Sequence, residues 1–201
     1  MLTRNKISSL VIDTLRKQTW GQNMAIIYLY CDYKGQKDQS AVNMIGSVVR
    51  QAAMGEPQIR SEIKRAFDES KQEGGDGLQL PDMVKLFVKV SGYMKAVYLC
   101  VDAVDEMLPE HRLKFLRMLR QIIQDTPNVR LFLTGRPYIR AELDKHLTEN
   151  AYAIHIVAEQ RDITRYLTQK MNDDEDHNPG LMTEDLKKKI MTTIVAKASG
   201  M

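Results

Sequence analysis

The first candidate site lies where an apolar run ends in an acid. Residues 96–102 read AVYLCVD, and Asp105 and Glu106 follow closely after Asp102. A carboxylate at the carboxyl end of a buried parallel strand projects into the crevice where such sheets bind ligands. In nucleotide hydrolases an acid there holds Mg²⁺, usually through water, and an acid a few residues later polarises the attacking water. Asp102 is therefore a candidate metal ligand, and Asp105 and Glu106 are candidate catalytic acids. The alternative is a polar loop with incidental acids.

The second candidate site follows another apolar run, at residues 129–134, which read VRLFLT. If the strands are parallel, Thr134 and Arg136 leave the sheet at the same edge as Asp102. The planar guanidinium of an arginine suits a terminal phosphate, so we take Thr134 and Arg136 as candidate nucleotide-binding residues. In the alternative interpretation, Arg136 pairs with the acids after Asp102 and ties two loops together.

The elements that must position these residues alternate between strands and helices. The apolar run at residues 24–31 is continuous rather than alternating, which is typical of a strand covered on both faces in a parallel sheet. We predict strands at residues 24–31, 96–102, 129–134 and 151–157. Helical periodicity separates them, with Ser40 as a cap and Pro81 in a first turn. The pattern predicts an α/β fold, a parallel sheet flanked by helices.

The sequence after the fourth predicted strand contains only helical patterns. One apolar stripe covers residues 163–171 and another covers 186–195, and the acidic run 173–176 between them predicts a solvated loop. We therefore expect an α/β core over residues 1–157 and a helical appendage over 158–201.

Composition excludes several classes of protein. With 29 Lys and Arg against 26 Asp and Glu, the net charge of +3 over 201 residues gives no sign of a nucleic-acid or membrane partner. No apolar run approaches the roughly 20 residues that span a bilayer, and the amino terminus lacks a signal peptide, so we expect a cytoplasmic protein. Cys31 and Cys100 are too few for a disulfide scaffold or a structural zinc site, and we expect two buried free thiols.

Six landmarks occur in order along nearly the whole chain: SSLVIDTLRKQ, YLYCDYKGQKDQSAVNMIGSVVRQ, VYLCVDAVDE, VRLFLTGRP, DITRYL and KASGM. With them the sequence resembles the NACHT branch of the STAND nucleotide-binding proteins. More narrowly, it is similar to the nephrocystin-type amino-terminal domain of fungal receptor-like proteins with ankyrin or WD repeats. The resemblance implies a P-loop-NTPase-like fold whose members act as ATP- or GTP-loaded switches that oligomerise and signal to fused effector domains.

The resemblance also implies roles for the candidate residues. VYLCVDAVDE corresponds to the Walker B segment, with Asp102 toward Mg²⁺ and Asp105 and Glu106 as accompanying acids. RLFLTGRP corresponds to the sensor 1 segment, with Arg136 facing the γ-phosphate, although Gly135 stands where the family generally has serine. The helices after residue 158 correspond to the start of the helical lid. The implied cofactors are ATP or GTP with Mg²⁺, and the implied partners are proteins or further copies of the chain.

The phosphate-binding loop of the family has no counterpart here. That loop needs glycines for close backbone approach and a lysine for the phosphates, and this chain contains no Gly-Lys dipeptide. Aligned without a gap, Thr3, Arg4 and Asn5 occupy the glycine, lysine and threonine positions. The strand that leads into this loop in the family is missing as well. The resemblance places that strand between the Walker B and sensor strands. These two strands would then keep unpaired inner edges or close up and pair directly.

Two functions follow from this pattern. The first is a nucleotide-binding switch module, truncated or degenerate, with weak or no hydrolysis because the loop supplies much of the phosphate affinity. The alternative is a non-catalytic interaction or oligomerisation scaffold. A nucleic-acid-binding domain draws little support, since the basic residues are interspersed with acids.

The strand order of the family makes a prediction about the two cysteines. It places the strand at 24–31 directly beside the strand at 96–102, with Cys31 and Cys100 near the same carboxyl edge. Whether their side chains face each other depends on the register, because a one-residue offset sends them to opposite faces of the sheet.

Overall fold

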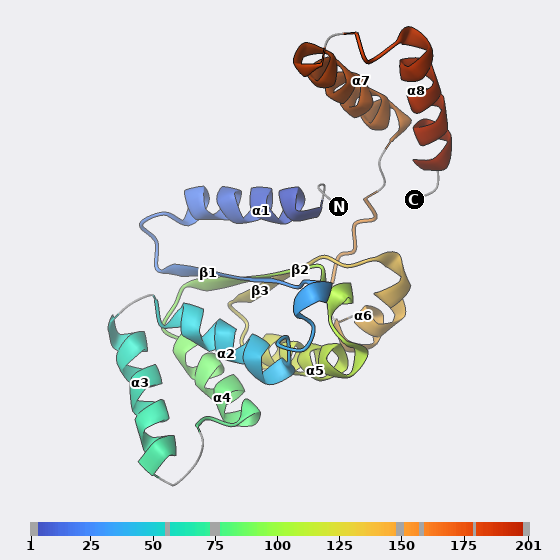
Figure 1. Cartoon of the computed structure of the whole chain (residues 1–201). Coiled ribbons are helices and arrows are strands. Elements are labelled where there is room, and N and C mark those ends of the chain that lie inside the picture. Colours follow the sequence, from blue (N-terminus) through green and yellow to red (C-terminus); the bar gives the residue numbers. More distant parts are fainter. Residues whose placement is uncertain are drawn as a thin grey trace. The chain divides into compact units, whose positions relative to one another are not determined.

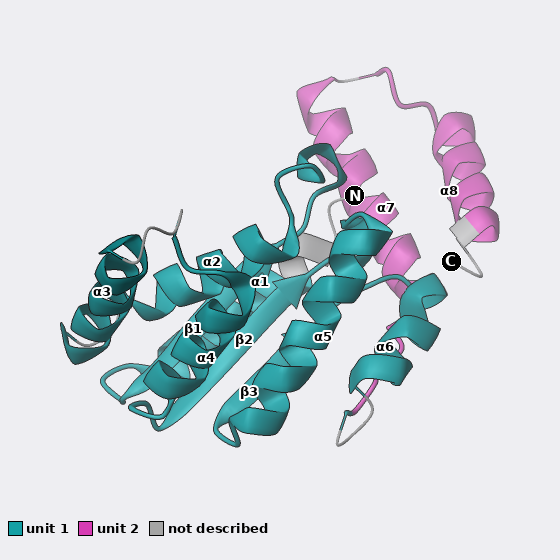
Figure 2. Ribbon diagram, turned by 90° about the horizontal axis from the view of Figure 1, so that it is seen from below, with its two compact units in different colours: residues 1–151 teal, residues 152–201 magenta. Residues whose placement is uncertain are grey.

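A computed structural model describes residues 4–54, 57–72, 77–147, 151–156, 159–178 and 180–198. The chain forms two compact units, residues 1–151 and 152–201 (Figure 2). They divide between residues 151 and 152, and the expected assignment of a core and a lid to residues 1–157 and 158–201 stays a prediction.

The first unit consists of helices that alternate with strands (Figure 1). Its helices are α1 (Arg4–Thr19), α2 (Ala41–Ala52), α3 (Pro57–Gln72), α4 (Leu80–Ser91), α5 (Pro109–Asp125) and α6 (Arg140–Leu147). Its strands are β1 (Met24–Tyr30), β2 (Ala96–Asp102) and β3 (Val129–Leu133), and short 3₁₀ turns cover Tyr33–Gly35 (η1), Val104–Glu106 (η2) and Pro137–Ile139 (η3). The three strands confirm the first three sequence predictions to within one residue.

The strands form a parallel sheet in the order β1-β2-β3. Tyr30 lies opposite Asp102, and Val101 lies opposite Leu133, so the three carboxyl ends meet at one edge of the sheet. The predicted α/β fold with a parallel sheet is confirmed, and β1 is the direct neighbour of β2 as expected. Of the two arrangements expected where the family's central strand is missing, the structure shows the second, because β2 and β3 pair directly.

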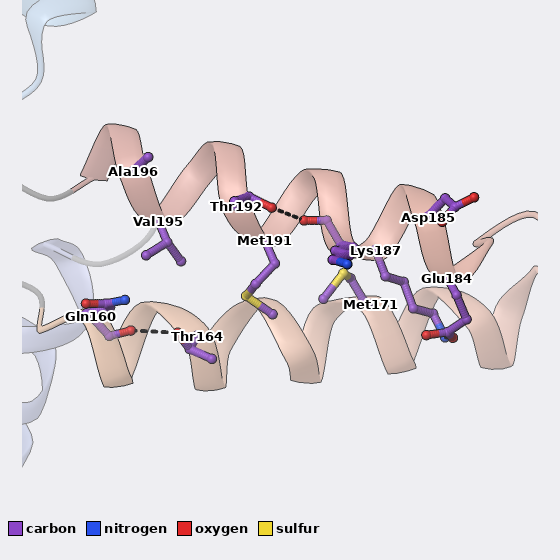
Figure 3. Close-up of a pocket in the computed structure, with 11 residues that line it drawn as sticks. Gln160, Thr164, Met171, Glu184, Asp185, Lys187, Met191, Thr192, Val195 and Ala196 are labelled. Carbon is purple, nitrogen blue, oxygen red and sulfur yellow. Dashed lines mark hydrogen bonds and ion pairs between the residues drawn. The ribbon is translucent and has the colours of Figure 1, made fainter.

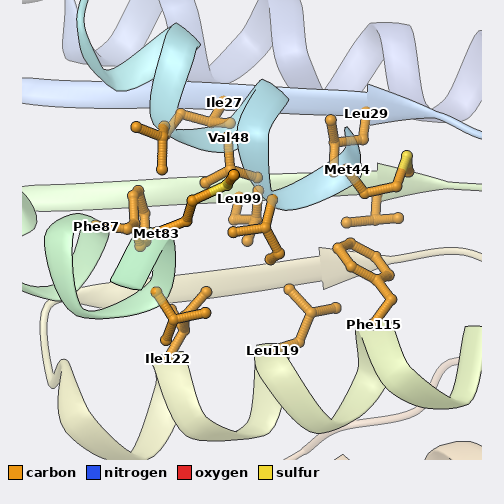
Figure 4. Packing of buried hydrophobic residues seen from close by; sticks show 14 of the residues in the cluster. Ile27, Leu29, Met44, Val48, Met83, Phe87, Leu99, Phe115, Leu119 and Ile122 are labelled. Atoms are coloured by element: carbon orange, nitrogen blue, oxygen red, sulfur yellow. The ribbon is translucent and has the colours of Figure 1, made fainter. Parts of the chain in front are cut away.

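The core lies on one side of this sheet. Helix α1 covers the opposite face, while α2, α4 and α5 pack against the core face (Figure 1). Inward side chains of β1 and β2, such as Ile27 and Leu99, meet Val48 of α2, Phe87 of α4 and Phe115 of α5 (Figure 4). Because side chains alternate along a strand, one set of residues faces the core and the other faces α1.

Local signals determine where helices begin. The Ser40 hydroxyl accepts a hydrogen bond from the Asn43 N–H at 3.2 Å, which confirms Ser40 as the cap of α2. Pro81 lies in the first turn of α4, where its missing N–H costs no helical hydrogen bond.

The fourth predicted strand is wrong over the residues described. Residues 151–156 form no strand, the described sheet ends at β3, and Val157 lies outside the described residues. The side chains of Tyr152, Ile154 and Ile156 are largely exposed. Alternating β-branched and aromatic residues favour a strand only where a neighbouring strand supplies hydrogen bonds and packing. The sequence pattern alone was therefore insufficient to predict a strand here.

In the second unit the described residues form helices α7 (Gln160–His177) and α8 (Glu184–Ala198), which pack against each other. An open groove runs between them, with Met171, Met191 and Val195 among its lining residues (Figure 3). The acidic run 173–176 lies inside α7, so its prediction as a loop is wrong. Ion pairs from Lys170 to Asp173 (3.6 Å) and from Lys187 to Glu175 (2.5 Å) offset the repulsion within the run.

None of the helices that the structure describes is both long enough and apolar enough to cross a membrane.

Candidate functional site

Asp102 is held by two hydroxyl groups at the carboxyl edge of the sheet. Its side chain ends β2 and is buried, with the residue only 3% exposed. The Ser8 hydroxyl of α1 donates to Oδ1 at 2.5 Å, and the Thr134 hydroxyl donates to the same oxygen at 2.6 Å. Three segments that are far apart in the sequence therefore meet at one carboxylate, and two of the predicted residues, Asp102 and Thr134, are in direct contact.

The chain turns sharply immediately after Asp102. Ala103 has a φ of +54°, in the left-handed region that residues other than glycine seldom occupy. Its N–H donates to the Thr134 hydroxyl at 2.8 Å, and the N–H of Val104 donates to the Thr134 carbonyl at 3.0 Å. Thr134 thus stabilises the strained turn that directs η2 and its acids away from the strand.

Asp105 is paired with Arg136. The Asp105 side chain is 1% exposed, and its Oδ2 lies 3.3 Å from Nε of Arg136. The backbone N–H of Arg136 also donates to Oδ1 at 3.1 Å, and the Tyr138 hydroxyl donates to the Asp105 carbonyl at 3.1 Å. The loops after β2 and β3 are therefore tied together, and the pairing of Arg136 with the acids after Asp102 is seen for Asp105.

Glu106 faces a different segment from the other two acids. Its Oε2 accepts a hydrogen bond from the Tyr33 N–H at 3.2 Å, and its carbonyl accepts one from Gln36 Nε2 at 2.7 Å. The three carboxylates consequently diverge toward three different sets of donors. Across the described ranges, no group of three or more His, Cys, Asp or Glu side chains is placed to hold a metal ion.

Arg112 also binds the loop after β2, although it is not among the residues predicted for the site. Its guanidinium is buried and makes two bonds to the Glu142 carboxylate, at 2.8 and 2.9 Å. It also donates to the carbonyls of Met107 (3.0 Å) and Asp105 (3.4 Å). The hydrogen bond from Arg112 lowers the pKa of Glu142, against an opposing effect of burial.

A signal in the sequence could have revealed Arg112 and Ser8. Arg112 precedes Leu116 by four residues on the apolar stripe of α5, and Ser8 precedes Ile12 by four residues on the buried face of α1. A polar residue on an otherwise buried helical stripe needs a partner in the interior, so both positions point to a buried polar contact.

The expected place for the phosphates falls largely beyond what the structure describes. Thr3 lies outside the described residues, and the side chains of Arg4 and Asn5 do as well. Their assignment to the glycine, lysine and threonine positions of a phosphate-binding loop stays a prediction.

Cys100 lies in β2 and Cys31 directly follows the neighbouring strand β1, and the two side chains point to opposite sides of the sheet. Cys100 is opposite Tyr28, and Cys31 lies three positions beyond Tyr28, so the odd offset separates the thiols. Both are free and buried. Burial raises the pKa of Cys31 to about 12, with a further contribution from Asp102, and raises the pKa of Cys100 to about 11.

These pKa values predict two unreactive thiols in the folded protein. At pH 8 the thiolate is the reactive form, and its population is far smaller than for an exposed cysteine. We expect a disulfide reagent to modify the native protein at least about 100-fold more slowly than the unfolded protein in guanidinium. The single variants Cys31→Ser and Cys100→Ser show which modification rate belongs to which thiol. Fast labelling of either thiol in the native state would contradict the prediction.

The fold and the site together define a parallel α/β protein with three acidic residues at and just beyond the carboxyl end of β2. Residues 5–136 match the family described as Nephrocystin 3, N-terminal, so the chain belongs to that family. The matched region contains all three strands and ends at Arg136, the last of the five predicted site residues. A search of curated proteins found no match.

Proposed function

We propose that this chain is a nucleotide-binding module of a signalling switch, of the NACHT and STAND type. It binds ATP or GTP with Mg²⁺ weakly, and it hydrolyses the nucleotide slowly or not at all. The observation that carries the proposal is the convergence of Asp102, Thr134 and Arg136 at the carboxyl edge of a parallel sheet, where such sheets bind ligands.

Each site residue has a role in the proposed module. Asp102 would hold Mg²⁺ through water, with its carboxylate positioned by Ser8 and Thr134. Arg136, whose side chain is 54% exposed, would contact the terminal phosphate. Asp105 and Glu106 would be the accompanying acids that polarise a water molecule. When bound there, Mg²⁺ would neutralise charge on the phosphates.

Weak affinity follows from the missing loop. Without a glycine-rich backbone cradle and its lysine, the phosphates lose several charge-assisted hydrogen bonds. Asp102, Asp105 and Glu106 already have hydrogen-bond partners within the protein, and a nucleotide must compete with those internal contacts.

A second candidate function, a non-catalytic scaffold for other proteins or further copies, is favoured by the same internal contacts. Asp102, Asp105 and Glu106 all have hydrogen-bond partners within the protein. A polar network that is satisfied internally can persist for stability alone, because fold does not determine function.

A nuclear magnetic resonance titration with Mg-ATP and Mg-GTP distinguishes the two candidates. We expect a dissociation constant of about 1 mM, equivalent to about 4 kcal/mol, with chemical shift changes centred on the turns after β2 and β3. Asp102→Asn should abolish the dependence of binding on Mg²⁺, because it removes the charge that holds the metal. Asp125→Asn, at the other end of α5, removes the same charge and should leave the titration unchanged.

Absence of shift changes up to about 10 mM nucleotide would reject the nucleotide-binding module and support the scaffold. A micromolar dissociation constant would contradict weak binding and show that Thr3, Arg4 and Asn5, or another segment, replace the loop.

A further inference from the structure

The Asp105–Arg136 pair joins a buried partner to an exposed one. The Asp105 side chain is 1% exposed, whereas the Arg136 side chain is 54% exposed. Nε of Arg136 lies 3.3 Å from the carboxylate, and the backbone N–H of Arg136 is bound to the same group. The guanidinium therefore combines contact with an interior charge and access to solvent.

We propose that Asp105 is an autoinhibitory latch that holds Arg136 away from anionic ligands. The inference rests on the proposed function, in which Arg136 contacts a terminal phosphate. An anion that binds the guanidinium competes with Asp105 for it, and breaking the ion pair between Asp105 and Arg136 opposes anion binding. Anion binding and opening of the latch are thus thermodynamically coupled.

The surroundings make Asp105 the fixed side of the latch. Its carbonyl accepts hydrogen bonds from the Tyr138 hydroxyl at 3.1 Å and from buried Arg112 at 3.4 Å. Its neighbour Val104 is fully buried and is bound to the Thr134 carbonyl. Opening therefore requires movement of the exposed Arg136 side chain, while the loop after β2 stays in place.

The latch is tested with inorganic tripolyphosphate and no Mg²⁺, measured by isothermal titration calorimetry on the whole chain. Asp105→Asn removes the charge and retains an acceptor for the Arg136 N–H. We expect this variant to bind tripolyphosphate about tenfold more tightly than the natural chain, within the usual range of coupling between sites. The gain should disappear in the double variant Asp105→Asn with Arg136→Gln.

Glu110→Gln is the matched control, because it removes one exposed carboxylate from the first turn of α5. We expect less than about a twofold change in tripolyphosphate affinity, since general charge effects at exposed sites are small. If Asp105→Asn does not fold by circular dichroism, Asp105→Ser takes its place.

An unchanged affinity in the Asp105 variant, or a gain that survives the loss of Arg136, would overturn the latch. These outcomes are independent of the proposed function, because the Mg-nucleotide titration depends on Asp102 and uses a different ligand. A latch confirmed with tripolyphosphate alongside a failed nucleotide titration would leave an anion site that is not a nucleotide site.

Discussion

Replacing Arg112 with methionine is expected to lower the free energy of unfolding by about 2–4 kcal/mol. Methionine keeps an unbranched chain in the interior but removes all donors. The Glu142 carboxylate then loses two hydrogen bonds, and the Met107 carbonyl loses one. The Glu142 side chain is 33% exposed and can be hydrated, so the loss stays below that of a fully buried pair. Urea unfolding followed by circular dichroism measures the difference.

The decrease in the free energy of unfolding that Arg112→Met causes should depend on pH. The pKa of Glu142 is lowered in the folded protein, chiefly by the hydrogen bond from Arg112. A lowered pKa contributes stability above the unfolded value of about 4.3 and loses it as pH falls through the folded value. The difference between the natural chain and Arg112→Met should therefore be largest near neutral pH and shrink in acid.

Arg117→Met provides the control for Arg112. Arg117 lies on the exposed side of the same helix, and its replacement should change the unfolding free energy by less than about 0.5 kcal/mol. Equal losses for the two variants, or a loss at Arg112 that is independent of pH, would contradict the assigned role of the Arg112–Glu142 pair.

Replacing Phe115 with alanine is expected to lower the free energy of unfolding by about 3–5 kcal/mol. Phe115 is fully buried between α5 and the sheet (Figure 4). Removal of its ring sacrifices the transfer free energy of a large apolar group and leaves a cavity that the packed surroundings fill only in part. The unfolding midpoint in urea should fall with an unchanged slope, which separates lost stability from a change in compactness.

Two control variants test whether the loss of stability comes from the cavity at Phe115. Phe115→Leu retains much of the volume and should cost less than about 1.5 kcal/mol. Lys114→Ala changes the exposed neighbour and should stay within about 0.5 kcal/mol, since alanine is a strong helix former. Similar losses for alanine and leucine at position 115 would show that the site collapses without a cavity.

The sequence by itself predicted the three strands and most helices of the first unit. Apolar runs mark β1, β2 and β3, and the cap Ser40 and the first-turn residue Pro81 mark two helix starts. These signals act over a few residues, through side-chain period and backbone geometry, so no tertiary information is needed to read them. The candidate residues Asp102 and Thr134 followed from the same reasoning, because strand ends place them at one edge.

The failures occurred where a pattern needs a distant partner. Residues 151–156 have the composition of a strand, but the described sheet ends at β3 and supplies none of the hydrogen bonds that a strand requires. The acidic run 173–176 looks like a loop because its charges repel one another, yet it lies inside α7, where Asp173 pairs with Lys170 and Glu175 pairs with Lys187.

The contacts of the site were decided by the tertiary structure alone. Ser8 and Asp102 are 94 residues apart, and only the register of β1 on β2 and the placement of α1 bring them together. The sequence left open whether Arg136 pairs with the acids or stays free, and direct pairing of β2 with β3 places it beside Asp105. Such contacts depend on the relative position of whole elements, a property of the packed core that no short sequence pattern contains.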